Sequence, residues 1–500
     1  MFALEMRVAL AALTLTSFAA VGCSRPPRLA ADLIITRASI WTGTAAMPSA
    51  TAVAVIGDRI VDVGGADQIE HWRGPGTTVL DAGGRRLVPG FNDAHARFAA
   101  GGIALDEVDL RGAGTAAEFA RRINERAKAK PGEWILGGHW DERHWTTAAL
   151  PTRSLIDDIT NSSPVFVIRD DGRMALANAA ALGRAGVTEH TPDPPGGALV
   201  RDARGYPTGV LQGSAMEIVA RVVPRTTVEQ RLHAVKRALE LAESLGITSV
   251  QDTGATDQDI AVYADLANRG ELTLRVYALP PEAGWYDQAK LGVHRAFGSP
   301  WLRIGGVHAS VGDASDAGEV KTRLMAADHA GLQLSIDSAA APSRALDLLD
   351  AIAKANGGRD RRFRIDSSRM IAADVDRVGP LNAIALLRSG TGDGAGRPLL
   401  DKGVRVALGS SWPAASLNPM VTLHAVVADR LTPAEALSAH TLGSAFAEFQ
   451  EGEKGTIARG KLADMVILSD DILTVPAAQI KDVRVLTTIV GGKVVHQRNP

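Results

Sequence analysis

Short apolar strand patterns alternate with amphipathic helix patterns between residues 87 and 445, and this alternation constrains the fold more than any other feature. Helix patterns occur at 115–130, 228–246, 319–331 and 343–358. Strand patterns occur at 164–170, 249–254, 302–311, 332–338, 363–368 and 404–411. Parallel strands need long crossover connections, which are usually helices. The alternation therefore predicts an α/β fold, most simply a (β/α)8 TIM-like barrel.

Both ends of the chain are rich in β-branched residues instead. Strand patterns bounded by glycine occur at 32–41, 51–65 and 77–90, and again at 463–469, 483–490 and 491–497. Glycine-bounded runs of this kind are typical of hairpins. We expect residues 31–86 and 446–500 to form one composite β-sandwich, with the barrel over 87–445.

Charge and composition exclude several classes of function. Lys and Arg number 54 and Asp and Glu 56, so the net charge is 54 − 56 = −2, which predicts no nucleic-acid partner. The apolar fraction of 46% and the charged fraction of 22% are ordinary for a globular protein and exclude wholesale disorder. A single cysteine excludes an internal disulfide and a cysteine-based metal site.

The N-terminal segment predicts export and lipidation. Residues 8–22 are uncharged, follow Arg7, and are too few for the roughly 20 residues of a spanning helix. The run ends Ala-Val-Gly before Cys23, which resembles a bacterial lipobox, with either Met1 or Met6 as its start. We expect a signal peptide over 1–23, lipidation of Cys23 and a proline-rich linker over 24–30. Ser24 favours outer-membrane anchoring on the periplasmic side.

Seven segments in order carry a family resemblance. They are VPGFNDAHARF (88–98), EWILGGHWDERHW (133–145), PVFVIRDDGRMALANAAAL (164–182), GGALVRDARGYPTGVL (196–211), ALGSSWPAASLNPM (407–420), ALSAHTLGSAFAEF (436–449) and GTIARGKLADMVILSDD (455–471). The series resembles the amidohydrolase-3 family of N-substituted formamide deformylase-like proteins, in the amidohydrolase superfamily. The resemblance implies a barrel with a composite β-sandwich and an insertion after the first strand, at about 105–215. It also implies metal-assisted hydrolysis of amide or formamide C–N bonds.

The positions that would carry this chemistry depart from the family pattern. Alternate strand residues share a face, so a His-x-His triplet on strand one would aim two imidazoles at a metal. Here the triplet is His95-Ala96-Arg97, and a guanidinium has no lone pair to offer. The other departures are His308 for a bridging lysine, Asp337 for a histidine, Ser367 for a histidine, Ser411 for the general-base aspartate, and Arg173 for a substrate-facing histidine.

Two functional hypotheses follow. The first is a pseudoenzyme or ligand-binding barrel that takes an unknown small molecule and needs no cofactor, with Arg97 in the former metal volume, paired to Asp337, Asp366 or another carboxylate there. The second is an active hydrolase with a rebuilt site, in which His95, His308 and Asp337 hold one divalent metal such as zinc. Asp93 shares a strand face with His95, which makes it a candidate to orient the His95 ring.

Overall fold

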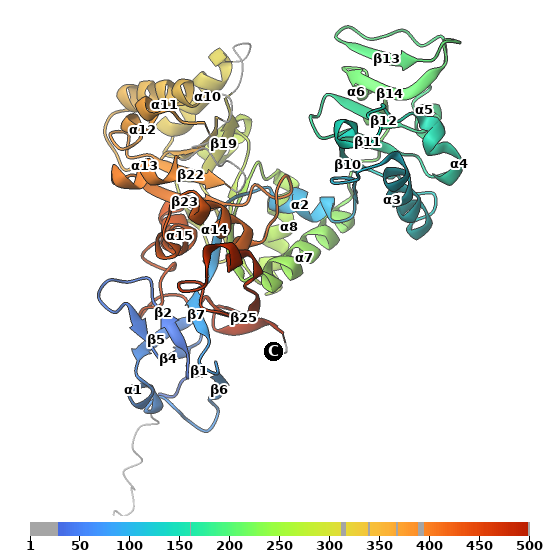
Figure 1. Cartoon of the computed structure of the whole chain (residues 1–500). Helices are drawn as coiled ribbons and strands as arrows, with labels where there is room; N and C mark the ends of the chain where they lie inside the picture. The colour runs from blue at the N-terminus through green and yellow to red at the C-terminus, as the bar shows by residue number, and fades with distance from the viewer. Residues whose placement is uncertain are drawn as a thin grey trace, which may run out of the picture.

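A computed structural model describes residues 29–160, 162–311, 317–338, 341–366, 369–388 and 395–498. Figure 1 shows three parts: a β domain built from the blue and red ends of the chain, an α/β barrel above it, and an inserted domain standing to one side of the barrel. In these described ranges no helix combines the length and the apolarity needed to cross a membrane.

The barrel consists of parallel strands in two sheets. The first sheet contains β8 (Phe91–Ala96), β15 (Ile247–Thr253), β16 (Arg275–Leu279) and β18 (Leu302–Ile304), with the short β17 (Phe297–Gly298) antiparallel at its edge. The second contains β19 (Gly306–Ser310), β20 (Gln333–Asp337), β21 (Arg364–Asp366), β22 (Ile384–Arg388) and β23 (Arg405–Gly409). The predicted α/β barrel is confirmed, although the sequence patterns had not identified β16 and β22.

The two sheets meet at two seams and close the ring. At one seam the Ser411 N–H donates to the His95 carbonyl at 2.8 Å. Here β23 approaches β8 so closely that a Cβ on Gly409 would lie 2.5 Å from the His95 Cβ. At the other seam the His308 N–H donates to the Pro280 carbonyl at 2.7 Å. Gly305, with φ +119°, makes the break between β18 and β19.

Helices cover the outside of the barrel (Figure 1). They include α7 (Val228–Ser244), α8 (Asp257–Asn268), α10 (Ala317–His329), α11 (Pro342–Asn356), α12 (Ala372–Val378), α13 (Gly396–Asp401) and α14 (Pro419–Ala428). Helix α7 begins with a capping box, in which the Thr227 hydroxyl accepts from the Gln230 N–H and the Gln230 side chain accepts from the Thr227 N–H. Its inner face buries residues at helical spacing, from Ala234 to Ala242. The helices predicted at 228–246, 319–331 and 343–358 are therefore confirmed.

Both ends of the chain build the β domain. One sheet has the order β5-β4-β1-β6, from β5 (Arg59–Gly64), β4 (Ala52–Ile56), β1 (Leu33–Thr36) and β6 (Thr78–Asp81). The other has the order β26-β25-β24-β7-β2-β3, from β26 (Lys493–Gln497), β25 (Val485–Val490), β24 (Met465–Leu468), β7 (Arg86–Pro89), β2 (Ser39–Trp41) and β3 (Ser49–Ala50). A shared apolar core joins them, with Ile35, Val53, Met465 and Ile489 at its centre.

The inserted domain lies between α2 (Phe98–Ala104) and α7. Its sheet has the order β13-β14-β12-β11-β10-β9, from β13 (Gly197–Arg201), β14 (Pro207–Gly213), β12 (Met174–Ala177), β11 (Phe166–Arg169), β10 (Gly137–Trp140) and β9 (Val108–Asp109). Helix α3 (Ala116–Ala129) packs beside it. The strand predicted at 164–170 is β11, so it belongs to this domain and not to the barrel. The Arg111 Nη1 donates to the Pro413 carbonyl at 3.0 Å and ties the domain to the loop after β23.

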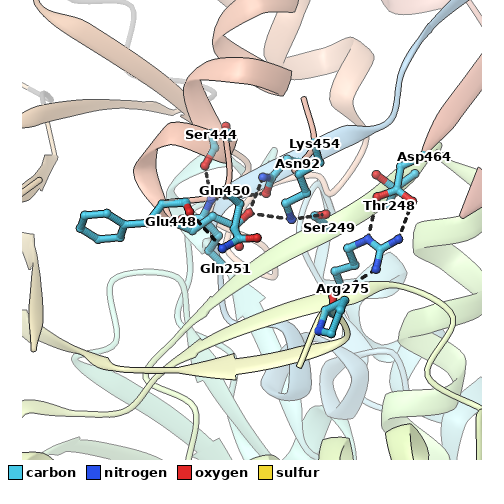
Figure 2. Close-up of polar contacts among 12 residues, drawn as sticks. Asn92, Thr248, Ser249, Gln251, Arg275, Ser444, Glu448, Gln450, Lys454 and Asp464 are labelled. Atoms are coloured by element: carbon cyan, nitrogen blue, oxygen red, sulfur yellow. Dashed lines mark hydrogen bonds and ion pairs between the residues drawn. The ribbon is translucent and has the colours of Figure 1, made fainter. Parts of the chain in front are cut away.

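A buried polar network closes the barrel at the N-terminal ends of its strands (Figure 2). The ammonium of Lys454 lies 2.7 Å from the Glu448 carboxylate, and both side chains are 3% exposed. The ammonium also donates to the Ser249 hydroxyl at 2.6 Å, and the Asn92 amide donates to Glu448 at 2.6 Å. Beside this pair, Arg275 donates to both oxygens of Asp464, at 2.7 and 2.9 Å. The network joins the barrel floor to the C-terminal segment that leads into the β domain.

Candidate functional site

The C-terminal ends of the barrel strands bring most of the predicted site residues to one mouth. His95 lies near the end of β8 and His308 within β19, Asp337 ends β20, and Ser411 follows β23. Because the C-terminal ends of parallel strands meet at one edge, this is where ligands bind in barrels of this type. Ser367 and Cys23 lie outside the described residues.

The two histidines face each other inside the mouth. Their ring centroids are 5.6 Å apart at an interplanar angle of 68°, and each residue is 5% exposed. Burial lowers the pKa of His95 well below its usual range, and the positive charges of Arg388, Arg364 and Arg97 lower it further. Burial also lowers the pKa of His308 to about 4, although Asp337 opposes the shift. Both imidazoles are therefore neutral at pH 7.

The carboxylates at the mouth are paired to an arginine that the sequence analysis missed. Arg388, the last residue of β22, lies 3.6 Å from the Asp337 carboxylate and makes a closer ion pair with Asp366. The side chain of Asp366 is 1% exposed and that of Arg388 is 14% exposed. One cation shared by two carboxylates cancels half of the negative charge to which a divalent ion would be drawn.

Among the described residues no carboxylate forms an ion pair with Arg97, so the predicted pairing with Asp337, Asp366 or another carboxylate of the site is wrong. Strand β8 ends at Ala96, and Arg97 is the residue that precedes the first turn of α2. Its backbone N–H donates to the Trp412 carbonyl at 2.8 Å, and the residue is exposed. Arg97 therefore lies just beyond the alternating residues of β8, although its charge still lowers the pKa of both histidines.

Three other candidates, Asp93, Ser411 and Arg173, have the following surroundings in the structure. Asp93 accepts the backbone N–H groups of His95 and Ser410, each at 3.0 Å, and does not orient the His95 ring. Burial raises the pKa of Asp93 to about 6. The buried hydroxyl of Ser411 has no hydrogen-bond partner in the described structure. Arg173 is exposed in the turn between β11 and β12 of the inserted domain, so it is not a residue of a barrel strand.

A further arginine lies inside the barrel itself. Arg364, the first residue of β21, has no solvent exposure, and its Nη2 donates to the Ala94 carbonyl of β8. Burial lowers its pKa to about 10. A charged residue within the short apolar pattern Phe-Arg-Ile-Asp is the signal that could have identified it, because Arg is rarely buried unless it is paired.

The donor set does not fit a metal ion. In the described part of the chain no three His, Cys, Asp or Glu side chains converge as a ligand group would. Asp337 and Asp366 face Arg388, and three guanidinium groups act on the two imidazoles. Hydrolytic zinc needs three protein ligands and an open position, and the described residues supply two neutral imidazoles.

Comparison with known proteins assigns the family. A model of the amidohydrolase family matches residues 78–496. The chain belongs to the amidohydrolase family. It is 33% identical to the protein LONG AFTER FAR-RED 3 of Arabidopsis thaliana, over 94% of this chain and 92% of that protein. It is 27% identical to the N-substituted formamide deformylase of Arthrobacter pascens, over 93% of this chain and 98% of the enzyme.

Solved structures support the same fold for this amidohydrolase-family chain. A protein described as an uncharacterized metal-dependent hydrolase from Pyrococcus horikoshii OT3 superposes with a TM-score of 0.73 at 21% identity, covering 89% of this chain and 99% of that one. A hydrolase with the same description from Pyrococcus furiosus gives a TM-score of 0.70 at 20% identity, covering 88% and 100%. The family resemblance inferred from the sequence is confirmed.

Proposed function

We propose that this amidohydrolase-family chain is a ligand-binding barrel, a pseudoenzyme that has lost metal-assisted hydrolysis. The observation that carries the proposal is the ion-paired cluster at the mouth, where Arg388 pairs with both Asp366 and Asp337. A carboxylate already paired to a guanidinium gives up that pair before it can ligate a metal. A small molecule entering the mouth meets neutral imidazoles and guanidinium N–H groups instead.

The electrostatics of the mouth favour the same conclusion. Arg388, Arg364 and Arg97 all lower the pKa of both histidines, so the imidazoles lie in a region of positive potential. A divalent cation placed between His95 and His308 would be repelled by these charges, and the repulsion is strong where water is scarce. Ser411 at the general-base position has a hydroxyl with no partner to activate it among the described residues.

A rebuilt metal site is the second candidate function. The 5.6 Å separation of the imidazole rings and their neutral state at pH 7 favour it, because neutral imidazole is a zinc ligand. This hypothesis requires Asp337 to leave Arg388 and turn to His308. The two candidates differ in metal content and in metal-dependent hydrolysis.

The deciding experiment measures metal in the purified full-length protein and its hydrolysis of N-alkylformamides and simple amides with added zinc or manganese. We expect less than 0.1 metal ion per chain (on the order of contamination) and no metal-dependent turnover. Stoichiometric zinc or manganese that disappears in His95→Ala and persists in the control His190→Ala would contradict the proposal. His190 is an exposed histidine of the inserted domain, its side chain 89% exposed.

We also propose that the chain is a lipoprotein anchored through Cys23, on the periplasmic side of a bacterial envelope. The uncharged run before Cys23 supports the proposal. The wild type should be found in the membrane fraction and incorporate labelled palmitate, and Cys23→Ser should lose both. A soluble wild type with an unmodified N-terminus would contradict it.

A further inference from the structure

Three polar side chains lie level with one another on neighbouring strands inside the barrel. Ser335 of β20 pairs in register with His308 of β19 on one side and with Arg364 of β21 on the other. Residues paired across parallel strands point to the same face of the sheet, so the three side chains form one row facing the barrel interior. Ser335 and Arg364 have no solvent exposure and His308 has 5%. We refer to them as the His308–Ser335–Arg364 row.

The side chains of the row are buried, yet several of their polar atoms have no hydrogen-bond partner in the described structure. In the described structure the Ser335 Oγ, the His308 Nδ1, and the Arg364 Nε and Nη1 are all buried without a hydrogen bond. The His95 Nδ1, from the strand across the seam, is in the same condition. Buried polar groups are hydrogen-bonded in nine cases or more out of ten, so five such atoms on the row and on His95, whose ring centroid lies 5.6 Å from that of His308, are suited to hydrogen-bond a ligand.

The chemistry of these atoms indicates which class of ligand they would bind. A guanidinium is a donor only, a hydroxyl donates readily, and each neutral imidazole carries one N–H. All four side chains can donate at once to a group rich in acceptors, whereas a metal ion would need lone pairs that Arg364 lacks. The ligand that fits is therefore an acceptor with negative charge.

The charged side chains around the row indicate how many negative charges the ligand carries. Arg364 forms no ion pair with any described residue, whereas Asp337 and Asp366 share Arg388. Tyr277, Glu448 and Asp93 act on Arg364 at longer range without an ion pair, and the carboxylates of Asp93 and Asp366 would repel a doubly charged ligand such as phosphate. One unpaired guanidinium beside neutral donors suits a single negative charge on two oxygens.

We propose that the His308–Ser335–Arg364 row binds the carboxylate of a small monocarboxylate, with Arg364 as its charged anchor. The inference rests on the proposed function and names the ligand class of that barrel. The Ser335 hydroxyl and the two imidazole N–H groups complete the hydrogen bonds of the carboxylate. Binding forms no covalent bond and requires no metal.

The test titrates the full-length protein with sodium formate and sodium acetate at constant ionic strength, with chloride as the replaced anion. Binding is followed by calorimetry and by the rise in unfolding temperature. We expect saturable binding of at least one carboxylate. Arg364→Met should weaken it about 10- to 100-fold, the range for a lost hydrogen bond to a charged group. Ser335→Ala should weaken it about 2- to 10-fold.

Arg303→Met is the matched control. Arg303 is also a buried barrel arginine, 7% exposed, but it lies on β18 in the other sheet of the barrel and is not part of the row. Its replacement should leave carboxylate affinity within about twofold of the wild type, as expected for a site remote from the ligand. Equal losses in Arg303→Met and Arg364→Met would overturn the inference, and so would phosphate binding more tightly than acetate. If Arg364→Met does not fold, an unchanged affinity in Ser335→Ala overturns it as well.

Metal content, hydrolysis and carboxylate binding, measured on the same protein preparation, test this inference and the proposed function separately. A metal-free, inactive chain that does not bind either carboxylate contradicts the inference alone. A zinc-loaded chain that hydrolyses amides and still loses acetate affinity in Arg364→Met contradicts the proposed function alone. Acetate binding that requires added zinc contradicts both.

Discussion

Two buried cations inside the barrel, Lys454 and Arg364, differ in how far their hydrogen bonds and ion pairs are satisfied. At the N-terminal end, Lys454 and Glu448 form an ion pair whose remaining hydrogen bonds are made by Ser249 and Asn92 (Figure 2). Farther along the barrel, Arg364 at the start of β21 is fully buried with two nitrogens unpartnered in the described structure. Both groups lie inside one barrel and have similar burial, so burial does not explain the difference.

The difference separates a structural network from a binding site. A buried polar network stabilises a fold when each of its members is satisfied, and a partly satisfied network costs free energy. At the floor of the barrel nearly all members of the network are satisfied, and the Gln251 Oε1 is an exception in that region. The His308–Ser335–Arg364 row is the second case, which is expected where a fold keeps polar groups free for a ligand. Each prediction below tests whether this comparison holds.

The largest effect should come from breaking the floor. Lys454→Met would leave the Glu448 carboxylate buried without its cation, which typically costs about 3–5 kcal/mol of unfolding free energy. Lys354→Met is the control, since Lys354 forms an exposed helical pair with Asp350 worth about 0.5 kcal/mol or less. Chemical unfolding of both variants measures the contrast. Equal and small losses would show that the floor network is not structural.

Acid should act on the mouth through His308. Its folded pKa is about 4 against 6.5 in the unfolded chain, so between these values the unfolded chain binds the extra proton. The contribution of His308 to the unfolding free energy is therefore fully present above about pH 6.5. It decreases as the pH is lowered, by about 2 kcal/mol between pH 7 and 5. His308→Asn should abolish that portion of the loss in unfolding experiments at the two pH values. His190→Asn gives the baseline for replacing an exposed histidine, and equal acid losses in wild type and His308→Asn would refute the assignment.

The sequence predicted the fold better than it predicted the site, for identifiable reasons. Helices with strong periodicity, such as α7 and α11, are recognisable from local sequence. Strand β22 has four consecutive apolar residues without alternation, followed by Arg388, and overlooking the strand also concealed that arginine. The position of Arg97 depended on where β8 ends, which the pattern of alternate residues does not reveal. The row of His308, Ser335 and Arg364 depends on register between strands distant in sequence.

The smallest expected effect is also the sharpest test of the comparison. Arg364→Met removes a buried guanidinium whose charge has no ion pair in the described structure, together with its one hydrogen bond to the Ala94 carbonyl. The lost hydrogen bond costs about 1.5–3 kcal/mol, and relief from burying an unpaired charge offsets a similar amount. In carboxylate-free buffer the unfolding free energy should therefore change by about 1 kcal/mol or less. The same variant should lose the stabilisation that acetate gives the wild type, because a ligand stabilises only the state that binds it. A loss of about 3–5 kcal/mol without ligand, as at Lys454, would instead make Arg364 a structural residue and remove the distinction between the floor and the row.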